Sequence, residues 1–184
     1  SWTQDKPILS LSWIESLALP KDAPIIDIGG GESHLVDYLF ALGYTDLSVL
    51  DISKAALQKS QARLGKNAAN VKWIEADITT FQAERTYALW HDRAVFHFLT
   101  QKRDIESYTR LVSTAVNQYL LMSTFSKEGP LKCSGLPIMQ YDAYGLTAIF
   151  SSDFKLLLQQ KEAHTTPFDT TQAFIYAMFQ KRES

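Results

Sequence analysis

The sequence predicts a single doubly wound α/β domain: a mostly parallel, seven-stranded sheet with an antiparallel last strand. Segments with strand and helix patterns alternate along most of the 184 residues, which is typical of a parallel sheet covered by helices on both faces. Two β-rich runs close the chain and predict an antiparallel pair. No repeat, low-complexity tract or linker interrupts the pattern, so we expect one domain over residues 1–184.

Spacing and local stop signals support each element of the first half. Leu9, Ile14 and Leu17 recur at helical spacing, Gly43 ends a helical pattern, and Ser53 can cap the helix that follows it. Short apolar runs between these helices read as buried strands. The expected helices cover 7–19, 34–43 and 54–65, and the expected strands cover 23–29, 47–53, 71–77 and 86–92.

The second half continues the alternation and then changes character. A helix and a fifth strand are expected first, followed by a long loop over 126–142, whose length favours a functional role. A further helix precedes the closing strand pair. The expected helices cover 104–116 and 141–150, and the expected strands cover 118–125, 153–161 and 172–181.

Composition excludes several classes of protein. Lys and Arg total 18 against 20 Asp and Glu, so the net charge of −2 provides no general basic field for a nucleic acid. No apolar run is long enough to span a bilayer, so we expect no membrane partner. The single cysteine, Cys133, fits a reducing compartment, and we expect a cytoplasmic protein. The four histidines and this cysteine lack metal-ligand spacing, so no metal site is expected.

Three consecutive glycines lie where the first strand turns into its helix, in "PIIDIGGGES". Bare backbone beside the amino end of a helix allows a ligand to approach closely. A dinucleotide turn would place its third glycine where the bulkier His34 stands. The spacing D-x-G-x-G-x-G fits better, with Asp27, Gly29 and Gly31 in place and Ser33 as the last member. The alternative is a tight turn that binds nothing.

Carboxylates follow the next two predicted strands. Asp51 ends the second strand, where it can accept hydrogen bonds from both hydroxyls of a ribose, and Asp77 ends the third, where it can accept from an adenine amino group. Either residue alone could be a helix cap or a turn residue. Together with the glycine turn, they predict a nucleoside bound across the carboxyl ends of the strands.

These motifs resemble those of class I S-adenosylmethionine-dependent methyltransferases, which have a Rossmann-like fold. "IIDIGGGES", "VLDIS", "EADI" and "ALWHDRAVFHFL" match in order and spacing over about residues 22–125. The chain departs from the pattern at Ser33 and lacks the Pro-Gly pair that usually precedes the fifth strand. The resemblance implies S-adenosyl-L-methionine as cofactor and S-adenosyl-L-homocysteine as product. The implied cofactor-binding residues are Asp27, Gly29, Gly30, Gly31, Ser33, Asp51, Ile52, Asp77, Ile78 and Trp90.

The same resemblance divides the chain into a lid and helix over 1–20, a cofactor-binding core over 22–125, and an acceptor loop with the strand pair over 126–184. In this family an acceptor attacks the methyl carbon of a sulfonium directly, and a general base is needed only when the acceptor must lose a proton. Candidate catalytic residues are Asp92, His97 and His91, although these side chains could instead pack or cap a helix. Candidate substrate-binding residues are Trp2, Gln4, Cys133 and His164.

Small substrate elements favour a small-molecule acceptor with a nitrogen, oxygen or sulfur nucleophile. The segment D-R-A, from Asp92 to Ala94, is also similar to D-K/R-G of protein lysine methyltransferases that act on citrate synthase or elongation factor. A protein lysine is therefore the alternative acceptor, and a non-catalytic cofactor-binding partner subunit is the alternative outside enzymes. A nucleotide-dependent reductase is disfavoured by His34. We expect a monomer or a weak dimer.

Overall fold

The computed structural model describes residues 6–184 and contains a seven-stranded sheet in the order β3-β2-β1-β4-β5-β9-β8. Strands β1 to β5 are parallel, whereas β9 is antiparallel to both of its neighbours, as predicted. The strands are β1 (Ile25–Ile28), β2 (Leu47–Asp51), β3 (Val71–Glu75), β4 (Tyr87–Arg93), β5 (Val116–Phe125), β8 (Phe154–Thr165) and β9 (Thr171–Lys181).

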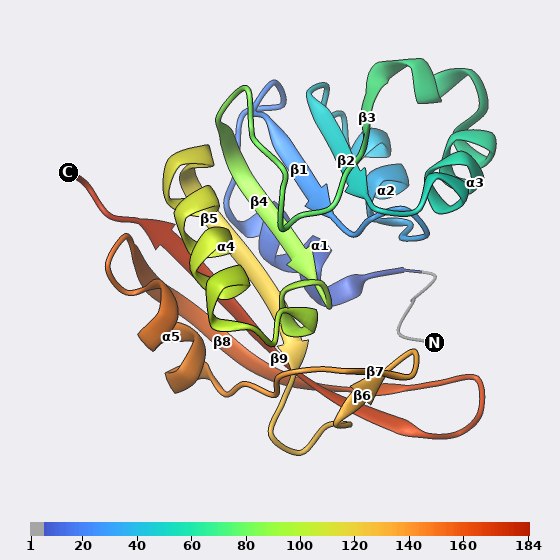
Figure 1. The fold of residues 1–184 in the computed structure, drawn as a ribbon. Coiled ribbons are helices and arrows are strands. Elements are labelled where there is room, and N and C mark those ends of the chain that lie inside the picture. The colour runs from blue at the N-terminus through green and yellow to red at the C-terminus, as the bar shows by residue number, and fades with distance from the viewer. Residues whose placement is uncertain (1–5) are drawn as a thin grey trace.

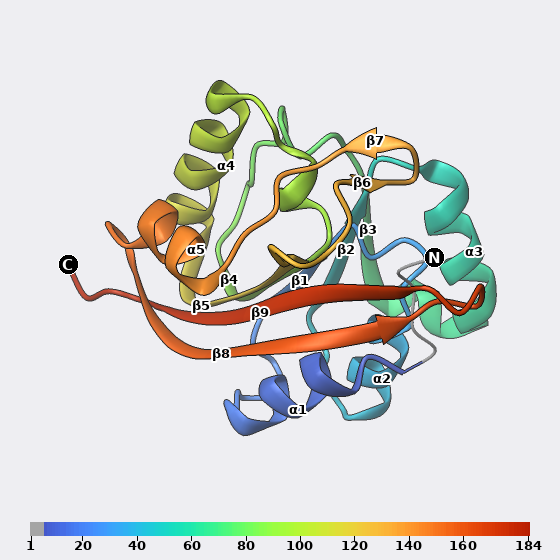
Figure 2. The same ribbon diagram turned by 90° about the horizontal axis from the view of Figure 1, so that it is seen from below.

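Helices cover both faces of this sheet, so the doubly wound prediction is confirmed (Figures 1 and 2). Helices α1 and α2 lie on one face with α3, and α4 and α5 lie on the other. The helices are α1 (Ile8–Ser16), α2 (Leu35–Ala41), α3 (Lys54–Leu64), α4 (Lys102–Ala115) and α5 (Ala143–Phe150), with short 3₁₀ turns η1 (Gly65–Asn70) and η2 (Phe96–Phe98).

The sheet divides the core into two layers. On the α1 side, Trp13 and Tyr176 meet edge to face with ring centroids 6.2 Å apart. On the α4 side, Trp90 and Tyr108 meet in the same way at 6.2 Å. Every residue of β1 and β4 is buried, so neither strand alternates between buried and exposed positions, although β4 ends in the polar residues His91, Asp92 and Arg93.

Local signals set the helix ends as expected. Ser53 is extended, and its hydroxyl accepts a hydrogen bond from the Ala56 amide at 3.1 Å, so it caps α3. Gly43 follows α2 with φ +93°, a conformation that glycine adopts at little cost.

The segment 126–142 is more ordered than the predicted loop. It contains a small hairpin of β6 (Lys132–Cys133) and β7 (Leu136–Pro137), whose turn residues Ser134 and Gly135 have φ of +50° and +79°. Two successive positive φ values are characteristic of a type I′ hairpin turn. Figure 1 shows this hairpin next to the carboxyl ends of β4 and β5.

Candidate functional site

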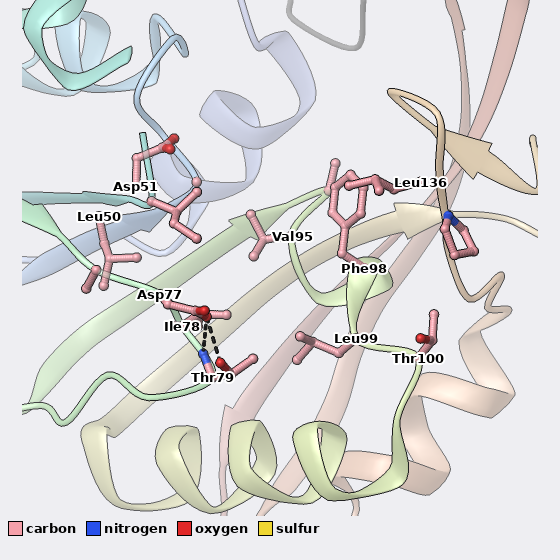
Figure 3. A pocket seen from close by; sticks show the side chains of 15 residues that line it. Leu50, Asp51, Asp77, Ile78, Thr79, Val95, Phe98, Leu99, Thr100 and Leu136 are labelled. Carbon is pink, nitrogen blue, oxygen red and sulfur yellow. Dashed lines mark hydrogen bonds between the residues drawn. The ribbon is translucent and has the colours of Figure 1, made fainter. Parts of the chain in front are cut away.

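A cavity of about 590 Å³ lies at the carboxyl ends of β1 to β4 (Figure 3). The order of the sheet reverses between β1 and β4, so the cavity is at the topological switch point where doubly wound folds bind ligands. Its walls come from the end of β2, from the segments after these four strands, including η2, and from β7. The motifs that the sequence analysis identified thus meet at one edge of the sheet.

The glycine turn shows why three glycines stand together. A Cβ on Gly29 would lie 2.1 Å from Val95 Cγ2, one on Gly30 would lie 2.3 Å from Asp27 Oδ2, and one on Gly31 would lie 2.7 Å from Asp51 Oδ2. Gly29 also has φ +70° and lines the cavity. A side chain at any of the three positions would displace a neighbour, so the turn presents bare backbone to the cavity.

Asp51 connects the glycine turn to the cavity. Its Oδ2 accepts a hydrogen bond from the Gly31 amide at 3.0 Å, and its Oδ1 accepts one from the Ser53 amide at 2.8 Å. The carboxylate lines the cavity beside Ile52, whose side chain is 70% exposed. An anionic group with an apolar wall beside it suits a ribose and the base that the ribose carries.

The segment after β3 forms the other end of this wall. Asp77 Oδ1 accepts hydrogen bonds from the amide and the hydroxyl of Thr79, at 2.9 and 2.7 Å. Asp77 and Ile78 line the cavity, and Leu99 also lines it from the segment after η2. A carboxylate between apolar side chains can bind an adenine ring through its amino group, so the residues present fit the nucleoside of S-adenosylmethionine.

Two groups of lining residues were missed by sequence reasoning. Phe98, Leu99 and Thr100 line the cavity from η2 and the residues after it, and Leu136 and Pro137 reach it from β7. Leu136 is 58% exposed although it is apolar. The turn dipeptide Ser134–Gly135 could have indicated the hairpin, but no local signal brings β7 next to the glycine turn.

The structure corrects the prediction for Trp90. This side chain is fully buried on the α4 side of the sheet, where its Nε1 donates a hydrogen bond to the Tyr108 hydroxyl at 3.0 Å. It does not line the cavity and cannot flank a sulfonium there.

Asp92 also points into the α4 side of the core. It accepts hydrogen bonds from the Tyr108 hydroxyl and from the amides of Val95 and Phe96, the latter two at 3.0 and 3.3 Å. Burial raises the pKa of this carboxyl to about 6, against the effect of these three donors. Asp92 therefore holds the turn after β4, and its predicted contact with the acceptor is wrong.

The two catalytic histidines are corrected as well. His91 lies on the α1 side, where its two ring nitrogens contact Ser10 and Asp27. His97 is fully buried, and its Nδ1 accepts a hydrogen bond from the Phe125 amide at 3.0 Å. Burial, together with the charge of Arg93, lowers the pKa of His97 to about 3. Its ring is neutral and its lone pair is occupied, so it is not a general base.

The remaining predicted residues have mixed outcomes. Cys133 is buried in the α1-side core, and burial raises the pKa of its thiol. The prediction that its sulfur contacts the acceptor is therefore wrong. Ser33 accepts a hydrogen bond from the Leu35 amide at 3.1 Å and orders the start of α2. His164 is half-buried on β8 opposite Gln172, and its role stays a prediction. Trp2 and Gln4 lie outside the described residues.

Another buried polar group at the end of β4 was not anticipated. Arg93 donates from Nε to the Tyr176 hydroxyl at 2.8 Å, and its guanidinium lies 4.6 Å from the centre of the Phe174 ring. Tyr176 and Phe174 come from β9, more than 80 residues later in the chain. This distance in sequence is why no motif indicated the group.

Two negative findings apply to residues 6–184. No group of three or more His, Cys, Asp or Glu side chains there could hold a metal ion. No helix in this part of the chain has the length and apolar character required to cross a membrane.

Comparisons with known proteins agree with this geometry. NodS, an N-methyltransferase from Bradyrhizobium japonicum WM9, has a similar fold, with a TM-score of 0.73 and 16% identity over 97% of this chain and 99% of that chain. 1,6-Didemethyltoxoflavin-N1-methyltransferase from Burkholderia thailandensis, with bound S-adenosylhomocysteine, also has a similar fold. Its TM-score is 0.74 and its identity 14%, over 96% of this chain and 78% of that chain. Magnesium protoporphyrin IX methyltransferase from Synechocystis PCC 6803, with bound S-adenosylmethionine, is a third protein of similar fold. Its TM-score is 0.72 and its identity 15%, over 95% of this chain and 77% of that chain.

No curated protein matches the sequence. A family model described as a methyltransferase domain matches residues 25–117, which is just over half of the 184 residues. The match spans the glycine turn, both cavity carboxylates and β4, and so covers all the lining residues except those of β7. The chain therefore belongs to the methyltransferase domain family, with the fold of class I S-adenosylmethionine-dependent methyltransferases.

Proposed function

We propose that this protein transfers the methyl group of S-adenosylmethionine to a nucleophilic atom of a small molecule. The observation that carries the proposal is the size of the elements over the cavity. Within residues 6–184, the hairpin β6–β7 contributes to the cavity wall, and no second domain covers it. A volume of about 590 Å³ lies inside the range of roughly 300–1,000 Å³ that small-molecule sites occupy.

The hydrogen bonds of the candidate bases favour one kind of acceptor atom. The bound cofactor supplies a methyl group on a positively charged sulfur, so the protein has to align the acceptor and exclude water. Asp92, His91 and His97 are each engaged in hydrogen bonds inside the protein. An acceptor that attacks without losing a proton to one of them, such as a neutral nitrogen, is favoured over an alcohol. Two of the structural neighbours are N-methyltransferases, which supports this choice.

A protein lysine is the second candidate, and one observation favours it. Ala94 has φ +69°, the left-handed conformation that glycine adopts most easily. The position that holds glycine in D-K/R-G therefore has, in this chain, a φ that glycine adopts easily. We expect a monomer or a weak dimer for either acceptor.

The experiment is a labelled methyl transfer. The protein is incubated with methyl-labelled S-adenosylmethionine and either a metabolite extract or a protein extract, and an Asp51→Asn variant serves as the control with impaired cofactor binding. A labelled low-mass product that the variant does not form supports the proposal. A labelled lysine in a protein band would replace it with the second candidate. Cofactor binding without transfer to either extract would favour a non-catalytic partner subunit.

A further inference from the structure

The wall of the cavity has two ends of different chemical character (Figure 3). At one end, Asp51 and Asp77 provide the two carboxylates that fit the nucleoside of S-adenosylmethionine. At the other end lie Phe98 and Leu136, and Pro137, which follows Leu136 in β7, also lines the cavity. Among the lining residues that the structure describes, only the two aspartates are charged. The end with Phe98 and Leu136 therefore suits an uncharged, apolar group.

This apolar end is the part of the cavity that an acceptor can use. The acceptor has to reach the methyl group through space that the nucleoside does not fill, and the two carboxylates place the nucleoside at the opposite end. Val95 lies between the two ends and is half-buried. An acceptor that enters from the apolar end would contact Val95, Phe98 and Leu136.

The cations closest in sequence to this wall do not line the cavity. Arg93 directly precedes a lining residue, yet its guanidinium is buried on the α1 side, where Nε donates to the Tyr176 hydroxyl. Lys132 is opposite Pro137 in the hairpin, but it is exposed and lies outside the cavity lining. A negatively charged acceptor group would therefore find no cation among the described residues of the cavity wall.

The hairpin holds Leu136 in a defined position. Leu136 pairs across the hairpin with Cys133, which is buried in the α1-side core. The amide of Met139, two residues after β7, donates a hydrogen bond to the carbonyl oxygen of His97 at 2.7 Å. His97 belongs to η2, which also contains Phe98. Phe98 and Leu136 are thus parts of one connected wall.

The exposure of Leu136 indicates what this wall would bind. Leu136 is 58% exposed although it lines the cavity. An apolar acceptor that covered it would remove apolar surface from water, which favours binding. A charged group placed there would lose its contacts with water and gain no partner. The hairpin also lies beyond residues 25–117, the region that matches the family model, so it is a feature outside that shared region.

We propose that Leu136 is a specificity-determining residue that, with Phe98, selects an acceptor whose nucleophilic nitrogen is attached to an uncharged, apolar body. The inference rests on the proposed function, because it names the class of small molecule that is methylated. The neutral nitrogen donates its lone pair to the methyl carbon, and the carbon–sulfur bond breaks with its electron pair on sulfur. The methylated nitrogen then loses a proton to water.

Two fluorescent dyes test the character of this wall. N-Phenylnaphthylamine is neutral, whereas anilinonaphthalene sulfonate has the same rings and one added negative charge. Each is titrated into the protein saturated with S-adenosylhomocysteine, which occupies the cofactor's part of the cavity. The neutral dye should bind about fivefold more tightly than the sulfonate or better, and Leu136→Ser should weaken its binding by about fivefold or more. Leu136→Met, which keeps an apolar side chain, should retain most of the affinity.

The matched control is Leu131→Ser. Leu131 directly precedes β6 and is 72% exposed, but it does not line the cavity. Its replacement should change the affinity for the neutral dye by less than about twofold. Equal affinities of the two serine variants, or tighter binding of the sulfonate by the unmodified protein, would overturn the proposal. Thermal unfolding without ligand establishes that each variant is folded.

The labelled methyl transfer separates this inference from the proposed function. After unreacted cofactor is removed, the products formed from a metabolite extract are partitioned between octanol and alkaline water, in which amines are neutral. Label in octanol supports the apolar acceptor. A charged product that stays in water would overturn it and leave methyl transfer to a small molecule in place. If neither phase contains label, the result counts against the proposed function, and the dye affinities still decide the character of the wall.

Discussion

At the scale of single residues, the end of β4 carries catalytic residue types that serve the structure. Asp92 holds the η2 turn through the amides of Val95 and Phe96, and His97 accepts from the Phe125 amide. Both ionisable groups are fully buried, and burial favours the neutral form of each: it raises the pKa of Asp92 and lowers the pKa of His97. Displacements of this kind accompany many active sites, but here burial and structural hydrogen bonds account for them.

His97 makes the stability of the protein depend on pH in a defined direction. Its pKa of about 3 in the folded protein lies below the ordinary value of 6.5, so the unfolded chain binds a proton more readily. The stabilisation is complete above pH 6.5 and decreases as the pH falls toward 3. At pH 4.5 the loss is about 2–3 kcal/mol, from 1.36 kcal/mol for each pH unit. Asp92 acts in the opposite sense, because its raised pKa of about 6 favours folding below the ordinary value of 3.8 and this benefit is lost as the pH rises through 6.

The measurement compares the protein with His97→Asn, whose amide oxygen can still accept from the Phe125 amide. Urea unfolding at pH 7 and pH 4.5 gives the change in free energy for each. The change should be smaller in the variant by about 2–3 kcal/mol, and the contribution of Asp92 cancels in the comparison. Equal changes in the two proteins would show that His97 is not held neutral.

At the scale of elements, the glycine turn joins three strands. Gly31 binds the carboxylate of Asp51 from β2, Gly30 lies against Asp27 of β1, and Gly29 lies against Val95, just after β4. Because each contact is to a different segment, the turn fixes the relative positions of the cavity walls as well as the approach of the ligand.

Gly29→Ala, in the glycine turn, and Gly65→Ala, after α3, separate the effect of backbone strain from the effect of side-chain contact. Both residues have positive φ, +70° and +59°, but a Cβ on Gly65 meets nothing within 4 Å. Gly65→Ala should cost about 1–3 kcal/mol of stability from its strained backbone conformation alone, with φ +59° and ψ −130°, and leave S-adenosylhomocysteine affinity unchanged. Gly29→Ala should cost more stability, since its Cβ would overlap Val95. It should also weaken the binding of S-adenosylhomocysteine by about tenfold or more. Chemical unfolding and calorimetry provide the two measurements, and equal ligand affinity in the two variants would contradict the role of the turn.

At the scale of the whole molecule, the strand order brings residues that are far apart in the sequence to one edge of the sheet. Gly29 after β1 and Pro137 of β7 are 108 positions apart, yet both line the cavity. Strand β9 lies inside the sheet between β5 and β8, so the C-terminal segment is part of the core rather than an appendage.

Ligand binding at this edge should stabilise the whole domain. S-Adenosylhomocysteine at 100 times its dissociation constant adds about 2.7 kcal/mol, which should raise the melting temperature by about 5–10 °C for a domain of this size. NAD at the same concentration should produce no comparable shift, because the bulk of His34 stands where a dinucleotide turn has its third glycine. Thermal unfolding with each ligand makes the comparison. A larger shift with NAD would contradict the assignment of the cofactor.

The sequence by itself determined the elements and the cofactor motifs, because both depend on local signals. Helical spacing, the cap at Ser53, the stop at Gly43 and the glycine turn act within a few residues, and the structure places them as predicted. The carboxylates Asp51 and Asp77 could be located for the same reason, since Asp51 ends β2 and Asp77 comes two residues after β3.

Tertiary structure alone decided which side chains reach the cavity. Strand β4 is buried on both faces, so its sequence carries no alternation to show that Trp90 and Asp92 point toward α4 while His91 points toward α1. Pairing with β1 sets that direction. The approach of Leu136 to the cavity and of Tyr176 to Arg93 depends on strand order, because these partners are distant in sequence and no local pattern records their contact.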